Sequence, residues 1–346
     1  MSRAAMLYLG TCALGRAIDA HGAPLDGGPP LCGRGVPLEF RLPRPNDRAP
    51  ITTPLWTGIR VVDGLLSVGR GARVGIFGAP GSGKSVLLEA IAGGCAADAV
   101  VIALVGERGR EAQRWIARRG EQMTIVCATS DRPAHERVLA ARVALAHADA
   151  LRERGLHVLL VIDSLARVAA ALREIAVKSG ERTGRAGYPP SVFAELARLV
   201  EVAGALAEGS ITLIATVLSD GDERDPVSDA ARSLLDGHVA LSTRLAHAGR
   251  FPAVDVLASA SRTMELVADA AQVRAAGRLR RAIALLDRVE DARALGIEPA
   301  DRSTRAAMAV ESRIESFLRQ ESAVASGSTL SQLAAIAALM DDDGDR

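Results

Sequence analysis

Eight consecutive residues constrain the fold of this chain more than any others. In order they are Gly78-Ala79-Pro80-Gly81-Ser82-Gly83-Lys84-Ser85, which fits the pattern G-x-x-x-x-G-K-[ST]. The apolar stretch Ala72–Phe77 before them predicts a buried strand, and Val86–Ala92 after them predicts a helix. A glycine-rich turn from a strand into a helix is typical of a phosphate-binding loop. The pattern therefore favours nucleotide binding over a chance glycine-rich turn.

The residue types in this loop suit a phosphate site. Glycines let backbone N–H groups close around a phosphate, and the following helix adds partial positive charge. Lys84 is one of only two lysines in a chain with 42 Lys and Arg residues. Its compact ammonium can reach β- and γ-phosphate oxygens, where a planar guanidinium is too bulky. The Ser85 hydroxyl can ligate Mg²⁺. We expect the segment from Gly78 to Val86 to bind the nucleotide.

Composition argues against several classes of function. A net charge of +1 and 3% aromatic residues leave neither a basic field nor many stacking platforms for nucleic acid. Cys12, Cys32, Cys95 and Cys127 form no C-x-x-C pair, which suits a reduced cytosolic protein better than a disulfide framework or a zinc site. No apolar run approaches the roughly 20 residues of a transmembrane helix. We expect a cytoplasmic protein that binds no nucleic acid.

The pattern along the chain divides it into three parts. Residues 1–50 are rich in Gly and Pro and predict strand fragments and a linker. Residues 51–262 alternate short apolar strands with helices, which predicts an α/β domain with a mainly parallel sheet. Residues 263–346 predict a helical domain. The strand candidates are Val100–Val105, Thr124–Ala128, Val158–Ile162, Ile211–Val217 and Val239–Ser242. The main helix candidates are Arg110–Arg119, Ala134–Arg154 and Ser191–Ala207.

Three further residues could complete a hydrolytic site. Asp163 ends the apolar run Leu159–Ile162 and is a candidate Mg²⁺-side carboxylate, the alternative being an N-cap for the next helix. Glu107 also follows an apolar strand and could position the attacking water, the alternative being a solvated loop charge. Arg262 follows the apolar stretch Val254–Leu257 and could be an arginine finger for a neighbouring subunit, the alternative being a surface salt bridge.

With these residues in place, the chain resembles the ATPases of type III secretion, in injectisomes and in flagellar export. It is more distantly similar to the catalytic subunit of rotary ATP synthases. The resemblance covers about residues 9 to 322. The matching segments, besides the phosphate-binding loop, are Leu14–Asp19, Pro24–Gly27, Thr57–Leu66, Gly106–Glu111, Ala128–Ala134, Ile162–Arg167, Gly187–Leu196, Leu235–His238 and Phe251–Leu257.

The resemblance implies roles that the residues alone leave open. It implies a P-loop core similar to RecA, with ATP and Mg²⁺ as ligands. Glu107 would polarise water, Asp163 would be the Walker B acid, and Arg262 would act in trans. Arg108 would help to order the site. Phe251 would stack on adenine, although from the sequence alone ordinary core packing is the simpler reading.

The family also implies partners and a location. It implies a cytoplasmic homohexameric ring at the inner-membrane base of a secretion apparatus, peripheral to the membrane and not inserted in it. Its partners would be stator and stalk proteins, export substrates and their chaperones. ATP hydrolysis would release chaperones and unfold substrates. The motif Ser130-Asp131-Arg132-Pro133 and the pair Phe251-Pro252 favour the injectisome branch over the flagellar branch.

The chain departs from the family at its N-terminus. Most relatives carry a β-barrel before the Leu14–Asp19 segment, and we expect only the tail of that barrel here. Either the chain is truncated, its start is misassigned, or its assembly relies on the core and C-terminal domains. Ala166 and Val168 replace a Thr and an aromatic residue of the family after Asp163. Two alternatives therefore stay open: a nucleotide-binding assembly subunit with little turnover, and a nucleic-acid translocase built on a similar core, which the charge disfavours.

Overall fold

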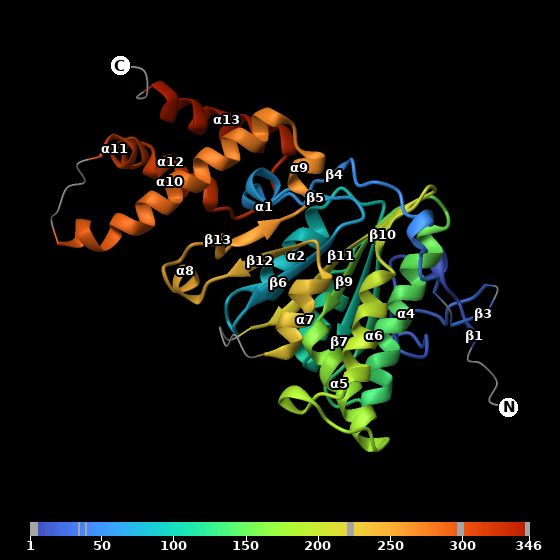
Figure 1. Cartoon of the computed structure of the whole chain (residues 1–346). Coiled ribbons are helices and arrows are strands. Elements are labelled where there is room, and N and C mark those ends of the chain that lie inside the picture. The colour runs from blue at the N-terminus through green and yellow to red at the C-terminus, as the bar shows by residue number, and fades with distance from the viewer. Residues whose placement is uncertain (1–5, 34, 39, 220–224, 296–300, 343–346) are drawn as a thin grey trace. The chain divides into compact units, whose positions relative to one another are not determined.

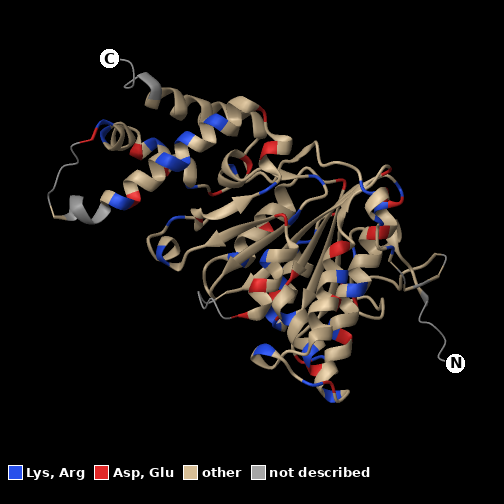
Figure 2. Ribbon diagram, in the orientation of Figure 1, with Lys and Arg blue, Asp and Glu red and all other residues tan. Residues whose placement is uncertain are grey.

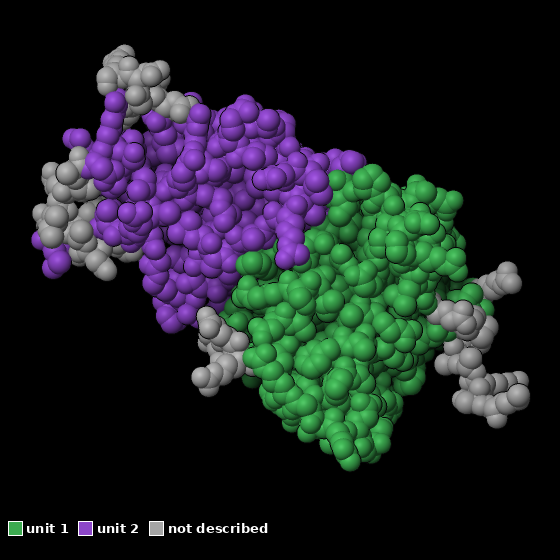
Figure 3. All heavy atoms as spheres, in the orientation of Figure 1, with its two compact units in different colours: residues 1–51, 70–80, 97–238 green, residues 52–69, 81–96, 239–346 purple. Residues whose placement is uncertain are grey.

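The computed structural model describes residues 6–33, 35–38, 40–219, 225–295 and 301–342. The chain forms two compact units (Figure 3). Unit 1 comprises residues 1–51, 70–80 and 97–238, and unit 2 comprises residues 52–69, 81–96 and 239–346. The chain passes from unit 1 to unit 2 inside the phosphate-binding loop, between Pro80 and Gly81.

Unit 1 is built on a parallel sheet, as the alternating pattern predicts. Its parallel strands follow the order β6 (Arg73–Gly78), β11 (Ser210–Leu218), β9 (His157–Asp163), β7 (Ala99–Val105), β8 (Met123–Ala128) and β2 (Ala17–Asp19). Every residue of β7, β8 and β9 is buried, which is typical of a parallel sheet covered on both faces. The strands predicted over Val100–Val105, Thr124–Ala128, Val158–Ile162 and Ile211–Val217 are confirmed.

Helices follow the strands of this sheet. They are α3 (Gly109–Arg118), α4 (Ala134–Arg152), α5 (Leu165–Lys178), α6 (Pro190–Glu201) and α7 (Pro226–Leu234). Helix α4 packs on β7, β8, β9 and α5, and α5 packs on α6 (Figure 1). Charged side chains lie on the helices and loops, whereas β7 and β8 carry none (Figure 2). The unit thus buries an aliphatic core between sheet and helices.

One predicted helix is too long. The pattern predicts a helix over Ser191–Ala207, but α6 ends at Glu201 and Gly204–Ala205 forms the short strand β10. Strand β10 pairs antiparallel with the start of β11. Gly204 has a φ of +151°, and a Cβ at this position would clash with the Arg48 guanidinium. The backbone of Gly204 therefore turns the chain back to the sheet edge before the helix can continue.

The first fifty residues form strand fragments, as predicted. They include β1 (Met6–Leu7) and β3 (Val36–Pro37), which pair antiparallel, and the 3-10 helices Gly10–Ala13 and Pro45–Asp47. Strand β2 of this segment instead joins the main sheet beside β8. The backbone N–H of Gly10 donates to Nδ1 of the buried His147 on α4 at 3.1 Å. The segment is therefore anchored to unit 1.

Unit 2 is mainly helical after residue 263, as predicted. Its elements are β4 (Pro54–Leu55), α1 (Arg60–Leu65), β5 (Val68–Gly69), α2 (Lys84–Gly94), α8 (Thr243–His247), β13 (Val254–Ser261), α9 (Met264–Val267), α10 (Ala270–Ala294), α11 (Arg302–Ala309), α12 (Glu311–Leu318) and α13 (Ser326–Asp342). Strand β12 (Gly237–Leu241) starts at the border of the units and neighbours β13. It confirms the strand predicted over Val239–Ser242, shifted by one to two residues.

The helices of unit 2 pack around α1. Helix α10 contacts α1, α11 and α13. The side-chain amide of Gln272 on α10 donates to the carbonyl of Asp63 and to the Ser67 hydroxyl, both at 2.9 Å. Phe317 of α12 is buried against Gly64, where a Cβ would come within 2.8 Å of its ring. Among the described residues, no helix is long and apolar enough to cross a membrane.

Candidate active site

Three of the predicted site segments lie at one edge of the sheet in unit 1. Strand β6 ends at Gly78, the first residue of the phosphate-binding loop, and β9 ends at Asp163. Strand β7 ends at Val105, two residues before Glu107. The register places Leu218 beside Gly78 and Leu104 beside Asp163, so these strands end at the same edge. Ligands of open parallel sheets bind at this carboxyl edge.

Asp163 is buried and held by a neighbouring strand. Only 6% of the surface of Asp163 is exposed. The Thr216 hydroxyl on β11 donates a hydrogen bond to its Oδ1 at 2.6 Å. The alternative that Asp163 caps the next helix is wrong, because Ser164 is the N-cap of α5. The Ser164 hydroxyl accepts from the backbone N–H of Arg167 at 3.3 Å. Asp163 thus points from the sheet edge as a buried carboxylate suited to a metal-bound nucleotide.

Glu107 is not a solvated loop charge, since only 5% of the residue is exposed. Its Oε1 pairs with Arg167 at 2.5 Å, whereas its buried Oε2 has no hydrogen-bond partner within the described structure. Burial, the interaction with the Glu111 carboxylate and the nearby charge of Asp163 raise the pKa of Glu107 to about 7, against the lowering effect of Arg167. A carboxylate with a pKa near neutral and one uncommitted oxygen suits the polarisation of water.

Arg167 is a site residue that sequence reasoning missed. It lies on the first turn of α5, and its Nη1 donates to the carbonyl of Gly106 at 2.6 Å as well as pairing with Glu107. Gly106 has a φ of +68°, and a Cβ there would come within 3.1 Å of the Arg167 Cδ. The guanidinium therefore ties α5 to the Gly106–Glu107 turn. The sequence signals for Arg167 were its place four residues after Asp163 and its position at the end of the matching segment Ile162–Arg167.

Arg108 lies at the start of α3 and is exposed. The interaction with Glu107 is the largest cause that lowers the pKa of Glu111, and the charge of Arg108 is a separate, smaller one. This contribution is indirect, so the ordering role implied for Arg108 stays a prediction.

The second half of the phosphate-binding loop belongs to unit 2. Gly81 and Gly83 have φ angles of +81° and +94°, and a Cβ at either would meet nothing within 4 Å. Lys84 opens helix α2, which has no acidic residue in its first turn. The Ser82 hydroxyl is fully buried and has no partner within the described structure. The partial positive charge at this helix start suits a phosphate.

Phe251 does not pack in the core, because the residue is 49% exposed. The core-packing reading is therefore wrong for this residue. It lines a cavity of about 80 Å³ in unit 2 together with Val86 of α2, which lies two residues after Lys84. The other lining residues are Ile59, Gly83, Leu87, Ala90, Leu241, Pro252, Ala253, Gln320, Glu321 and Ser322. This apolar cavity starts at the phosphate-binding helix, where a nucleotide base would lie.

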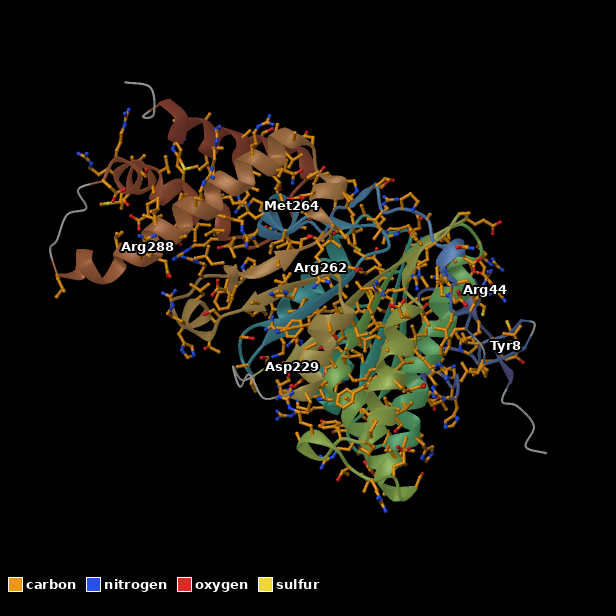
Figure 4. The ribbon with its side chains drawn as sticks, in the orientation of Figure 1. Tyr8, Arg44, Asp229, Arg262, Met264 and Arg288 are labelled. Carbon is orange, nitrogen blue, oxygen red and sulfur yellow. The ribbon has the colours of Figure 1, made fainter. Side chains whose placement is uncertain are left out.

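Arg262 follows β13 and is exposed (Figure 4). Its guanidinium forms no salt bridge with any residue in the described part of the chain. Within the described residues, Arg262 therefore does not form the surface salt bridge that was its alternative role. An exposed arginine without an ion-pair partner remains available to an anionic group.

The residues fit a metal ion that arrives with a nucleotide. In the described ranges, no group of three or more His, Cys, Asp or Glu could hold a metal by itself. Mg²⁺ in phosphate sites is held by one or two protein oxygens together with phosphates and water. In unit 1, Asp163 carries oxygens of this kind, and Glu107 Oε2 is buried and unpaired. In unit 2, Ser85 carries such an oxygen, and Ser82 Oγ is buried and unpaired.

Comparisons with known proteins agree with this geometry. The model of the ATP synthase alpha/beta family, nucleotide-binding domain, matches residues 58–261. A type 3 secretion system ATPase from Xanthomonas euvesicatoria is 46% identical over 297 residues, covering 84% of this chain and 67% of that protein. A flagellum-specific ATP synthase from Bacillus subtilis is 44% identical over 292 residues, covering 82% and 66%. The chain thus spans about two thirds of the length of both relatives.

A solved structure shows the same fold. The assembled ATPase EscN in complex with its central stalk EscO, from the type III secretion system of enteropathogenic E. coli, superposes with a TM-score of 0.90 at 38% identity. The match covers 96% of this chain and 83% of that chain. At 38% sequence identity, this chain and EscN share both their fold and their family.

Proposed function

Because the chain belongs to the family of type III secretion and flagellar export ATPases, we propose that it hydrolyses ATP to ADP and phosphate in a homo-oligomeric ring that energises protein export. The observation that carries the proposal is Glu107. It is a buried carboxylate with a pKa raised to about 7 and one unpaired oxygen, at the sheet edge where the phosphate-binding loop begins. These are the properties of a group that orients water for attack on a phosphate.

The other residues take roles that follow from their chemistry. Residues 78–86 hold the phosphates through backbone N–H groups, and the Lys84 ammonium neutralises charge on the β- and γ-phosphates. Ser85 and Asp163 would hold Mg²⁺, which would stabilise negative charge on the phosphates. Arg262 reaches the γ-phosphate in a neighbouring subunit, and Phe251 contacts the base. Arg108 supports the Glu107 turn.

The proposed partners rest on the relatives. EscN was solved in an assembled form with a central stalk, and by analogy this chain forms a hexamer around a stalk protein. We infer cytoplasmic rings at the inner-membrane base of a secretion apparatus, with stator proteins, export substrates and their chaperones as partners. ATP hydrolysis would release chaperones and unfold substrates. The identities of 46% and 44% to injectisome and flagellar relatives do not separate the two systems.

Mg²⁺-dependent ATP turnover across a wide range of protein concentration tests the proposal. Specific activity should rise steeply with concentration, because each site would be completed by a neighbour. Lys84→Ala serves as the blank, since loss of the ammonium removes the group that binds the phosphates. Activity that stays at the level of the blank while nucleotide binds would overturn the proposal in favour of a binding subunit without turnover.

A further inference from the structure

A buried hydroxyl group on β11 contacts the carboxylate proposed to hold Mg²⁺. We infer that Thr216 is a positioning residue, whose hydroxyl keeps the Asp163 carboxylate in the orientation that binds Mg²⁺ arriving with a nucleotide. The inference rests on the proposed function, because it concerns the metal of the same site. It adds to that site a residue of unit 1 that neither the sequence patterns nor the family resemblance singled out.

The pairing of β9 with β11 brings the two residues to the same level of the sheet. The parallel ladder joins Ser210–Ala215 of β11 to His157–Ile162 of β9. Thr216 and Asp163 are the next residues of the two strands. Paired residues of neighbouring strands present their side chains to the same face of a sheet. The register of the sheet therefore sets Thr216 beside Asp163, at the carboxyl edge where ligands bind.

The hydrogen bond between them has the geometry of a strong one. Thr216 is fully buried, and its hydroxyl donates to Oδ1 of Asp163 at 2.6 Å. This distance lies in the range of about 2.5–2.7 Å that is typical of a hydroxyl donating to a carboxylate, and such bonds are roughly twice as strong as neutral ones. A carboxylate with one oxygen held by a donor on a rigid strand cannot turn freely about its Cβ–Cγ bond. The bond therefore fixes the orientation of Asp163.

Strand formation does not explain the hydroxyl of Thr216. Valine has nearly the shape of threonine and is also enriched in strands, and the next residue of β11 is Val217. A buried hydroxyl costs free energy unless it forms a hydrogen bond. The backbone of β11 is already paired, with β9 up to Ala215 and with β6 beyond it, where Thr216 lies beside Ile76. The hydroxyl therefore acts on the carboxylate and is not needed to hold the sheet together.

The orientation of this carboxylate matters because Mg²⁺ demands near-ideal octahedral geometry from its oxygen ligands. A ligand that is already oriented loses less freedom when the metal binds. Partners that orient a metal ligand typically contribute about 10–100-fold to metal affinity or activity. We expect an effect in this range when the Thr216 hydroxyl is removed.

Nucleotide binding at increasing Mg²⁺ concentration tests the inference without turnover. The full chain carrying Thr216→Val is titrated with a non-hydrolysable fluorescent ATP analogue across a series of Mg²⁺ concentrations. The Mg²⁺ concentration for half-maximal enhancement of binding should rise about 10–100-fold relative to the wild-type chain. Binding without Mg²⁺ should be unchanged. In ATP hydrolysis the same shift should appear in the Mg²⁺ dependence, while kcat at saturating Mg²⁺ should be largely regained.

The outcomes separate the inference from the proposed function. An unchanged Mg²⁺ dependence in a folded Thr216→Val chain would overturn the inference. Wild-type binding that did not respond to Mg²⁺ would overturn it as well, since Asp163 would then hold no metal. If the wild-type chain bound nucleotide with Mg²⁺ but released no phosphate, the proposed turnover would be refuted, and the binding comparison would still decide the role of Thr216.

Thr212→Val is the matched control. Thr212 lies on the same face of β11, is fully buried, and its hydroxyl accepts from the N–H of Gly71 at 2.8 Å. Its replacement also removes a buried hydrogen bond, but it should leave the Mg²⁺ dependence unchanged. An equal shift in Thr212→Val would show a general loss of packing and contradict a positioning role.

Two further variants grade the donor at position 216. Thr216→Ser keeps the hydroxyl and should restore the wild-type Mg²⁺ dependence. Thr216→Cys replaces it by the weaker S–H donor and should give an intermediate shift, which also keeps the test decisive if Thr216→Val does not fold. Thermal unfolding followed by circular dichroism shows which variants are folded. A Thr216→Ser chain shifted as far as Thr216→Cys would contradict the role of the hydroxyl.

Discussion

At the scale of single residues, Glu107 and Arg167 form the ion pair on which we expect the proposed chemistry to depend. Burial and two neighbouring carboxyl groups favour the protonated form of Glu107, and the Arg167 guanidinium favours the charged form. Only the charged form can accept a proton from water. Arg167 also fixes which oxygen is used, since it occupies Oε1 and leaves Oε2 unpaired. It is thus a positioning residue for the proposed base.

The pH dependence of turnover should report this balance. Because the pKa of Glu107 is raised to about 7, activity should be low in acid and rise as the pH passes through about 7. Arg167→Gln removes the group that lowers this pKa, so the midpoint should move to higher pH and turnover at pH 7 should fall more than turnover at pH 9. The measurement is kcat against pH from 5.5 to 9.5.

The matched control for this series is Arg137→Gln. Arg137 also lies near the Gly106 turn, but it pairs with Glu174 at 2.8 Å and not with Glu107. Its replacement should leave the midpoint where it is, and Arg167→Lys should restore part of the wild-type profile. An unchanged midpoint in Arg167→Gln would contradict the assigned role.

At the scale of elements, the start of α5 decides where Arg167 lies. The Ser164 side chain caps this helix immediately after the strand that ends at Asp163. The last residue of the strand, Asp163, the cap Ser164 and the arginine that pairs with Glu107 therefore lie within five residues of one another in the sequence. The cap satisfies a backbone N–H that has no partner inside the helix.

Loss of this cap should have a measurable cost in stability. Ser164→Ala should lower the free energy of unfolding by about 1 kcal/mol, because the N–H of Arg167 loses its acceptor. Urea denaturation followed by circular dichroism measures the change. Ser179→Ala, at the exposed opposite end of α5, is the comparison and should change stability by less than about 0.5 kcal/mol. Equal effects of the two substitutions would rule out a specific capping role.

At the scale of the whole molecule, the exposed Arg262 points to assembly. It has no ion-pair partner in the described residues, so we expect it to be available to the γ-phosphate of a neighbouring subunit. Arg262→Ala should still bind ATP but reduce turnover by roughly 10³-fold or more, as for other arginine fingers. Steady-state hydrolysis and nucleotide binding, measured side by side, check both parts.

Mixed assemblies then test action in trans. Arg262→Ala and Glu107→Gln chains should each be inactive alone. Mixed together, they should regain activity, because an Arg262→Ala subunit keeps its own Glu107 and receives Arg262 from its neighbour. Absence of recovery in assemblies shown to contain both chains would place Arg262 outside the neighbour's site.

Patterns over short stretches of sequence predicted much of this protein. The phosphate-binding loop, the parallel strands and the C-terminal helices were all foreseeable, because strand and helix periodicity and glycine spacing act over a few residues. The end of α6 was not, since it depends on the pairing of Gly204–Ala205 with β11. The domain borders at residues 50 and 262, and the roles of the site residues, stay predictions.

The sequence by itself determined which residues could do the chemistry, and only the tertiary structure decided how they are committed. Lys84, Glu107 and Asp163 stand out because each follows an apolar strand. The bond from Thr216 to Asp163 spans 53 residues, that from Arg167 to Gly106 spans 61, and that from Gln320 to Gly58 spans 262. Contacts between residues so far apart follow from packing of the whole fold, and no local pattern encodes them.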